Sequence, residues 1–355
     1  WFLEKRRYLI DELGVDGFKT DGGEFVWGSD VVASNGLSGR SLRNAYPDAY
    51  AQAYYDFINA DGHERVTFSR AGGSSMQTHP LCWIGDQLSD EKAFKSAIIA
   101  AQSASMSGIP FVAWDIAGFS GDVPTTELYC RSVTQAAFSP VMQLHSETSG
   151  DPSPSVARTP WNMAERKGSD TCLEVYKYYA NLRMNLLPYI YSEAAYSSES
   201  GEPLMRSMAY EFPEDGEAAE YEYQYMLGRS LLVAPVTEIS SGMVEVYLPE
   251  GEWYGFFDGE RYEPGTHIFE CELDEIPVFV RAGSVIPLNT VDGKLGSYVG
   301  NDTESYSELE FWSFADGSEY DWFDYVSGEQ YTLKLTDEYT KLAVPYEYSV
   351  RCFAA

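Results

Sequence analysis

The stretch GVDGFKTDGGEFVWG, residues 14–28, decides the fold prediction, because in it an apolar run gives way abruptly to charged and hydroxyl groups. The apolar residues 15–18 indicate a short β-strand, and Lys-Thr-Asp-Gly-Gly-Glu follows at once. Taken alone, the stretch fits a strand that ends in a polar turn. The rest of the sequence has to show whether these polar residues belong to a site.

The same pattern recurs along residues 1–213, where segments that favour strands alternate with segments that favour helices. Predicted strands cover 15–21, 65–71, 81–86, 109–119, 139–147 and 203–213, and predicted helices cover 1–13, 44–60, 90–108, 127–138 and 170–198. Such alternation predicts a parallel β/α architecture. Five of the strands end in polar residues: Asp21, Arg70, Asp86, Asp115 and His145.

Polar groups gathered at one end of a parallel sheet are what the active face of a (β/α)8 barrel requires. A Rossmann-type sheet is the alternative, but no G-x-G-x-x-G opens a helix. After residue 213, short apolar runs between Pro, Gly and Asp turns predict antiparallel β-structure. The predicted fold is therefore α/β: a partial TIM barrel of the later strands (1–213), a proximal C-terminal β domain (214–288) and a distal β-sandwich-like domain, complete or not (289–355).

Composition excludes several classes of function. The 355 residues include 24 Lys and Arg against 55 Asp and Glu, a net charge of −31, which repels nucleic acid and anionic membrane surfaces. No run approaches the roughly 20 apolar residues of a membrane span. The five cysteines are widely spaced and odd in number, with no disulfide framework and no Cys-x-x-Cys metal pattern, which favours a reducing, cytoplasmic location. Homo-oligomerisation is left open.

Two aspartates fit the chemistry of glycosidic bond cleavage. Side chains alternate along a strand, so Lys19 and Asp21 share a face, and the lysine would favour the ionised form that a nucleophile needs. Asp86 follows Trp83, and an aromatic wall helps a carboxyl group to keep its proton, as a general acid must. Two carboxyl groups tuned in opposite directions can cleave a bond to a sugar.

Other residues of the strand ends are suited to binding a sugar. Hydroxyl-binding candidates are Arg70, Asp115 and His145, and ring faces come from Trp27, Trp83, Trp114 and Phe119. Each also fits a helix cap, a surface ion pair or the core. Two other functions stay open: a barrel metalloenzyme that uses Asp21, Glu24 and His145, although no His-x-His spacing supports it, and a sugar-binding protein without catalysis.

At these residues the chain resembles glycoside hydrolase family 31, the α-glucosidase and α-xylosidase family. The similarity lies in GVDGFKTDGGE, SRAGGSS, WIGD, WDIAGF and MQLHSE, in this order, and continues through RTPWN and YMLGRSLLVAPV. The resemblance implies a retaining α-glycosidase acting on an oligosaccharide or other α-glycoside by double displacement, with an α-glucoside as default and α-xylosides or α-galactosides open. This glycosidase mechanism implies no metal or organic cofactor.

The resemblance also implies residue roles. Asp21 would be the nucleophile and Asp86, 16 residues after Arg70, the acid/base. Substrate-binding residues would be Lys19, Arg70, Trp83, Asp115, Phe119 and His145.

Two departures from the family pattern stand out. The family's N-terminal β-sandwich and first barrel strands have no counterpart here, and Trp1 lies within a predicted helix, so we interpret the sequence as the later part of a longer protein that is not active as this fragment. Gly22 follows the predicted nucleophile where relatives commonly carry a bulky residue. The hypothesis is a wider pocket that accepts a bulkier glycone.

Overall fold

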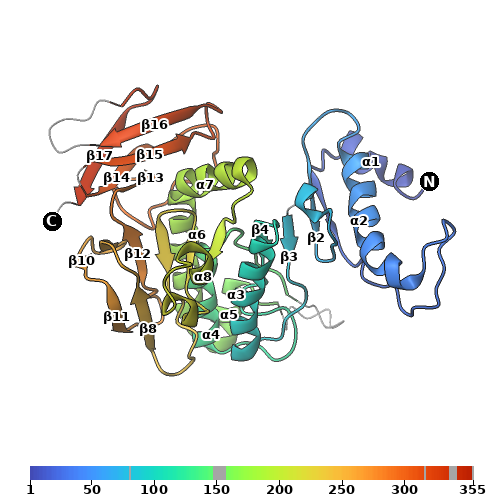
Figure 1. The fold of residues 1–355 in the computed structure, drawn as a ribbon, viewed down its shortest axis with the longest axis horizontal. Coiled ribbons are helices and arrows are strands. Elements are labelled where there is room, and N and C mark those ends of the chain that lie inside the picture. Colours follow the sequence, from blue (N-terminus) through green and yellow to red (C-terminus); the bar gives the residue numbers. More distant parts are fainter. Residues whose placement is uncertain (80, 147–156, 316, 336–341, 354–355) are drawn as a thin grey trace.

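The computed structural model describes residues 1–79, 81–146, 157–315, 317–335 and 342–353. The molecule is elongated (Figure 1): α1, α2 and β2 lie at one end of the long axis and the last β-strands lie at the other. Strands β3 and β4 and the helices that follow them lie between these ends.

The N-terminal part contains one parallel sheet in sequence order, which confirms the predicted β/α architecture. Its strands are β1 (Gly17–Thr20), β2 (Val66–Ser69), β3 (Leu81–Trp83) and β4 (Phe111–Ala113). The elements before and between them are η1 (Glu4–Arg6), α1 (Arg7–Asp11), α2 (Gly39–Ile58), η2 (Met76–Thr78) and α3 (Glu91–Met106), and α4 (Thr126–Ala137) follows β4.

The alternation of side chains along β1 separates core from site. Phe18 packs on helix α2, with ring centroids 5.9 Å from Tyr54 and 6.5 Å from Phe57. Lys19 points to the opposite face, where its Nζ lies 4.0 Å from the ring centroid of Trp83. The Phe18 face of β1 thus packs on helix α2, and the Lys19 face points to the side where the predicted site residues lie.

Three predicted elements differ from the structure. The helix predicted over 170–198 is two helices, α6 (Thr171–Asn185) and α7 (Leu187–Ser200), because Pro188 lacks an N–H and its ring would clash with a carbonyl of the preceding turn. The predicted strand 139–147 holds, in its described residues, one isolated bridge between Asp115 and Gln143. The predicted strand 203–213 is a short strand followed by one helical turn, β5 (Met205–Ser207) and α8 (Met208–Glu211).

The C-terminal part is built from antiparallel pairs, apart from the parallel pair β14–β17. A six-stranded sheet has the order β10-β9-β12-β7-β6-β5, and β8 pairs with β11. The bounds are α5 (Pro160–Lys167), η3 (Ala218–Glu220), β6 (Tyr225–Leu227), β7 (Leu231–Val233), β8 (Met243–Leu248), β9 (Trp253–Gly255), β10 (Arg261–Tyr262), β11 (Gly265–Glu270), β12 (Val278–Arg281), β13 (Ser284–Thr290), β14 (Glu308–Phe314), β15 (Ser318–Phe323), β16 (Gln330–Leu335) and β17 (Tyr348–Phe353).

One hydrophobic cluster runs from the barrel helices into the last sheets, including Phe94 on α3, Tyr179 on α6 and Trp322 on β15. Burial of this continuous apolar surface holds the two parts together. The domain boundaries at 213/214 and 288/289 stay predictions, and strand β13 crosses the second.

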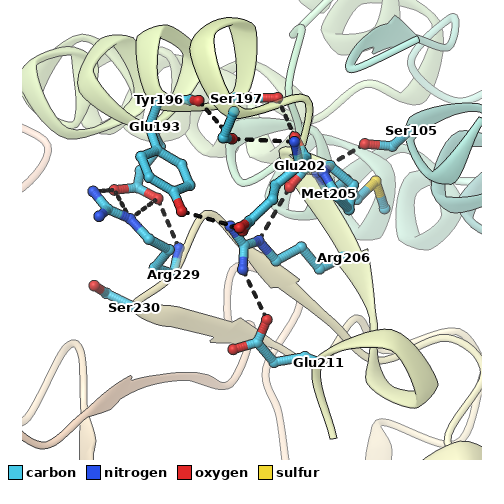
Figure 2. Close-up of polar contacts among 12 residues, drawn as sticks. Ser105, Glu193, Tyr196, Ser197, Glu202, Met205, Arg206, Glu211, Arg229 and Ser230 are labelled. Carbon is cyan, nitrogen blue, oxygen red and sulfur yellow. Dashed lines mark hydrogen bonds and ion pairs between the residues drawn. The ribbon is translucent and has the colours of Figure 1, made fainter. Parts of the chain in front are cut away.

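A buried ion pair fixes helix α7 to the C-terminal sheets (Figure 2). Glu193 is 1% exposed and accepts from Arg229 in the β6–β7 turn, through the guanidinium at 2.8 Å and the backbone N–H at 2.7 Å. Tyr320 on β15 donates to the same carboxylate at 2.7 Å. Nearby, Arg206 donates to Glu202 at 2.7 Å. Because the Glu193 carboxylate accepts from both Arg229 and Tyr320, it ties α7, the β6–β7 turn and β15 together.

Candidate active site

The predicted site residues lie where the parallel strands end. Asp21 and Arg70 directly follow β1 and β2, Asp86 comes three residues after β3, and Asp115 comes two after β4. All four therefore lie at the carboxyl edge of the sheet, where β/α-barrel enzymes carry their chemistry.

The guanidinium of Arg70 joins both predicted catalytic carboxylates. Its Nε lies 3.3 Å from Asp21 Oδ1, one terminal nitrogen lies 3.0 Å from Asp86 Oδ2, and the other lies 2.7 Å from Glu24 Oε1. Partial burial lowers the pKa of Arg70, but Glu24, Asp21 and Asp86 outweigh this effect and raise it overall. The planar guanidinium of Arg70 thus contacts both aspartates, which follow the two strands on either side of β2.

Lys19 does not take the predicted place beside Asp21 in the described contacts. Its Nζ lies 3.0 Å from His145 Nδ1 and over the ring of Trp83. An ammonium can only donate, so Nδ1 accepts and the His145 ring is neutral in this contact. Burial and the nearby Lys19 charge lower the pKa of His145. The cation next to Asp21 is Arg70, because β2 rather than β1 brings its side chain over that carboxylate.

Asp115 forms a second, buried part of the site. Its side chain is 0% exposed, Gln143 Nε2 donates to Oδ1, and His145 Nδ1 lies 3.8 Å from the same oxygen. Burial raises the pKa of Asp115 to about 6, although the Gln143 hydrogen bond and the Lys19 charge oppose the shift. The other oxygen, Oδ2, is buried without a hydrogen-bond partner among the described residues. An unpaired buried acceptor of this kind suits a ligand hydroxyl.

The aromatic candidates divide into site and core. Phe119 packs on His145, with ring centroids 4.8 Å apart. Trp83 is 2% exposed and lies buried under Lys19, which it contacts through its ring face. Trp114 instead stacks on Phe94 at 5.2 Å and donates its indole N–H to a glutamine of α4, so it packs in the core. Trp27 is 70% exposed on the loop after β1.

Sequence reasoning missed three residues at the site. Glu24 was considered only as a metal ligand, but it pairs with Arg70. Gln143 orients Asp115, and its position two residues before His145 was the available signal. Phe25 lies against Gly22. None of the three ends a predicted strand, so the strand-end pattern does not point to them.

The described residues hold no group of three or more His, Cys, Asp or Glu side chains placed to bind a metal ion. The metalloenzyme alternative required Asp21, Glu24 and His145 together, whereas Arg70 contacts the first two and Lys19 contacts the third. Within the same described ranges, none of the helices combines the length and hydrophobicity that a bilayer-spanning segment needs.

A parallel β/α sheet with carboxylates at its strand ends is the arrangement of β/α-barrel enzymes. Residues 1–193 match the model of the glycosyl hydrolases family 31 TIM-barrel domain, and residues 201–286 match the family 31 C-terminal domain. The chain therefore belongs to glycosyl hydrolase family 31. This membership confirms the predicted barrel followed by C-terminal β-structure.

Similar proteins act on α-linked sugars. The chain is 43% identical to an isomaltosyltransferase of Sporosarcina globispora over 96% of its length, covering 31% of that protein. The cycloalternan-forming enzyme of Listeria monocytogenes, solved with a pentasaccharide substrate, has a TM-score of 0.91 at 46% identity, over 95% of this chain and 32% of that one. The cycloalternan-degrading enzyme of Trueperella pyogenes, solved with a covalent intermediate, has a TM-score of 0.77 at 43% identity, over 80% and 39%. The chain thus spans about a third of the length of these relatives.

Proposed function

We propose that the full-length protein cleaves α-linked glucosides with retention of configuration, and that the sugar it takes up is an isomaltosyl unit. The observation that carries the proposal is the shared contact of Asp21 and Asp86 with Arg70 at adjoining strand ends. Retaining glycosidases need two carboxyl groups about 5–5.5 Å apart around one anomeric carbon.

In the first step, the carboxylate of Asp21 attacks the anomeric carbon while the bond to the leaving oxygen breaks. Asp86 gives its proton to that oxygen, and a β-linked glycosyl-enzyme results. In the second step, Asp86 removes a proton from an incoming hydroxyl, whose oxygen attacks the same carbon and releases Asp21. The covalent intermediate solved in the Trueperella pyogenes relative supports this sequence.

Substrate binding is assigned to the buried part of the site. Asp115 offers its unpartnered Oδ2 to a sugar hydroxyl, and Lys19 and His145 line the same face. Trp83 and Phe119 supply apolar walls. No step in this scheme calls for a metal or organic cofactor.

The incoming hydroxyl distinguishes hydrolysis from transfer. The isomaltosyltransferase name of one relative favours a second sugar as acceptor, and we propose transfer to a sugar hydroxyl as the main reaction, with water as the competing acceptor. Product analysis with and without added acceptor sugar measures the ratio of the two outcomes.

The experiment that tests the proposed function is chemical rescue of the full-length Asp21→Ala variant by azide. Azide should enter the space of the missing carboxylate and give a β-glycosyl azide from an activated aryl α-glycoside. An α-glycosyl azide would contradict Asp21 as the nucleophile, because azide would then have attacked a β-linked glycosyl-enzyme formed on another carboxylate. A wild-type enzyme that releases the inverted sugar would refute the retaining mechanism. A wild-type protein that binds but never cleaves would favour a sugar-binding protein.

A further inference from the structure

The loop between β1 and α2, residues 21–38, carries exposed apolar side chains next to the predicted nucleophile. Phe25 is 60% exposed, Trp27 is 70% exposed and Val32 is 69% exposed. The loop is held by its own backbone, since the amide of Gly39 donates to the carbonyl of Val31 at 2.6 Å. Apolar side chains exposed together on one loop mark a candidate binding surface.

The ring of Phe25 takes the place of a side chain at position 22. Gly22 has φ +81°, and a Cβ built there would lie 2.9 Å from Phe25 Cε2. Phe25 therefore occupies part of the space beside Gly22, and a wider pocket at this position stays a prediction. Glycine is required here by the backbone conformation and by the ring together.

Phe25 also lies near the guanidinium of Arg70. The guanidinium carbon of Arg70 lies 6.0 Å from the ring centroid of Phe25, and Glu24, the preceding residue, pairs with Arg70 at 2.7 Å. Trp27 follows next, with its ring centroid 6.5 Å from that of Phe25 and an interplanar angle of 53°. The two rings thus follow each other along the loop, and the first of them lies against Gly22, the residue after Asp21.

We propose that Phe25 and Trp27 form the platform for a two-sugar glycone. Phe25 would cover the sugar whose anomeric carbon Asp21 attacks, and Trp27 would carry the second sugar. The inference rests on the proposed function and names the residues that hold the two sugars of the isomaltosyl unit. The C–H faces of pyranose rings are apolar, and large rigid rings bind them with little loss of conformational entropy.

The test compares two substrates on the full-length enzyme, an aryl α-isomaltoside and an aryl α-glucoside, which differ by the second sugar. For Trp27→Ala, kcat/KM for the isomaltoside divided by kcat/KM for the glucoside should fall about tenfold, which corresponds to about 1.4 kcal/mol of transition-state binding. Trp27→Phe, which keeps a ring, should recover most of that ratio. Val32→Ala, on the same loop, is the matched control and should keep the wild-type ratio.

The outcomes separate this inference from the proposed function. An unchanged ratio in Trp27→Ala, with an active wild type, overturns the platform and leaves the retaining mechanism standing. An equal fall on both substrates together with a lower unfolding midpoint also overturns it, because Trp27 is then a packing residue covered by the rest of the protein. A wild-type protein that cleaves neither substrate overturns the proposed function itself.

Discussion

Replacing Asp115 with asparagine should stabilise the protein at neutral pH while it damages the site. The carboxyl group is fully buried, and Gln143 satisfies one of its oxygens but nothing among the described residues satisfies the other. Burial raises the pKa of Asp115 from 3.8 to about 6. The folded protein therefore prefers the neutral acid, and ionisation at neutral pH costs stability.

The size of the expected stabilisation follows from the raised pKa of Asp115. Because the folded pKa exceeds the unfolded one, the stabilising contribution of the neutral acid is fully present below about pH 4 and is lost as pH rises through about 6. The rise of the Asp115 pKa from 3.8 to about 6 corresponds to a loss of about 3 kcal/mol of folding stability above pH 7. Asparagine has almost the same shape and no charge, so Asp115→Asn should gain up to about 3 kcal/mol at pH 8 and almost nothing at pH 4.

The assay is thermal unfolding of both full-length proteins at pH 4 and pH 8, compared as differences between apparent midpoints, since a multidomain protein need not unfold in two states. Activity should fall at least tenfold, because an amide nitrogen replaces an acceptor of the sugar hydroxyl. Asp292→Asn, at a 75% exposed carboxylate, is the control for the change in net charge. An equal midpoint difference at both pH values, or a lower midpoint of the variant at pH 8, would show that ionised Asp115 does not destabilise the folded protein.

Three further variants test other parts of the account. Arg70→Met should lower kcat/KM about 100-fold, because one guanidinium positions both predicted catalytic carboxylates. Arg70→Lys should not restore the activity, since an ammonium cannot contact both carboxylates in the same geometry. Near-normal steady-state kinetics of Arg70→Met would argue against this role of Arg70. Gly22→Ala should lower the free energy of unfolding by about 1–3 kcal/mol, because the new Cβ meets the ring of Phe25 at a positive φ. Gly14→Ala is the control and should cost less, since Gly14 also has a positive φ but open space around it. Equal urea midpoints of the two variants would contradict the contact between position 22 and Phe25. Glu193→Gln should cost about 3 kcal/mol by leaving Arg229 without its buried partner, and an unchanged melting midpoint would show that the pair is dispensable.

The strand ends could be predicted from sequence because an apolar run followed by polar residues is a local signal. That signal placed Asp21, Arg70, Asp86 and Asp115 at one edge of the sheet, as the structure has them. Their catalytic and binding roles stay predictions, since position alone does not show chemistry. His145 lies beside Asp115 although it is not in a strand. An isolated bridge between Asp115 and Gln143, two residues before His145, holds the backbone there.

What could not be predicted depends on contacts between distant residues. Local alternation placed Lys19 opposite Phe18, but its contact with His145 and the contact of Arg70 with Asp21 depended on residues far apart in the sequence. The break in the long helix lies at Pro188, which is a local signal in the sequence. The position of Phe25 beside Gly22 depended on a loop whose course no periodic pattern specifies.

The most direct measurement is to trap the glycosyl-enzyme of the full-length protein with a fluorinated α-glycosyl substrate and to map the labelled peptide by mass spectrometry. Attack by the strand-end carboxylate predicts one added sugar on the peptide that contains Asp21, and no label in the Asp21→Ala variant. A label on Asp86 or on any other carboxylate, or turnover without any trapped species while the configuration is inverted, would contradict the assignment.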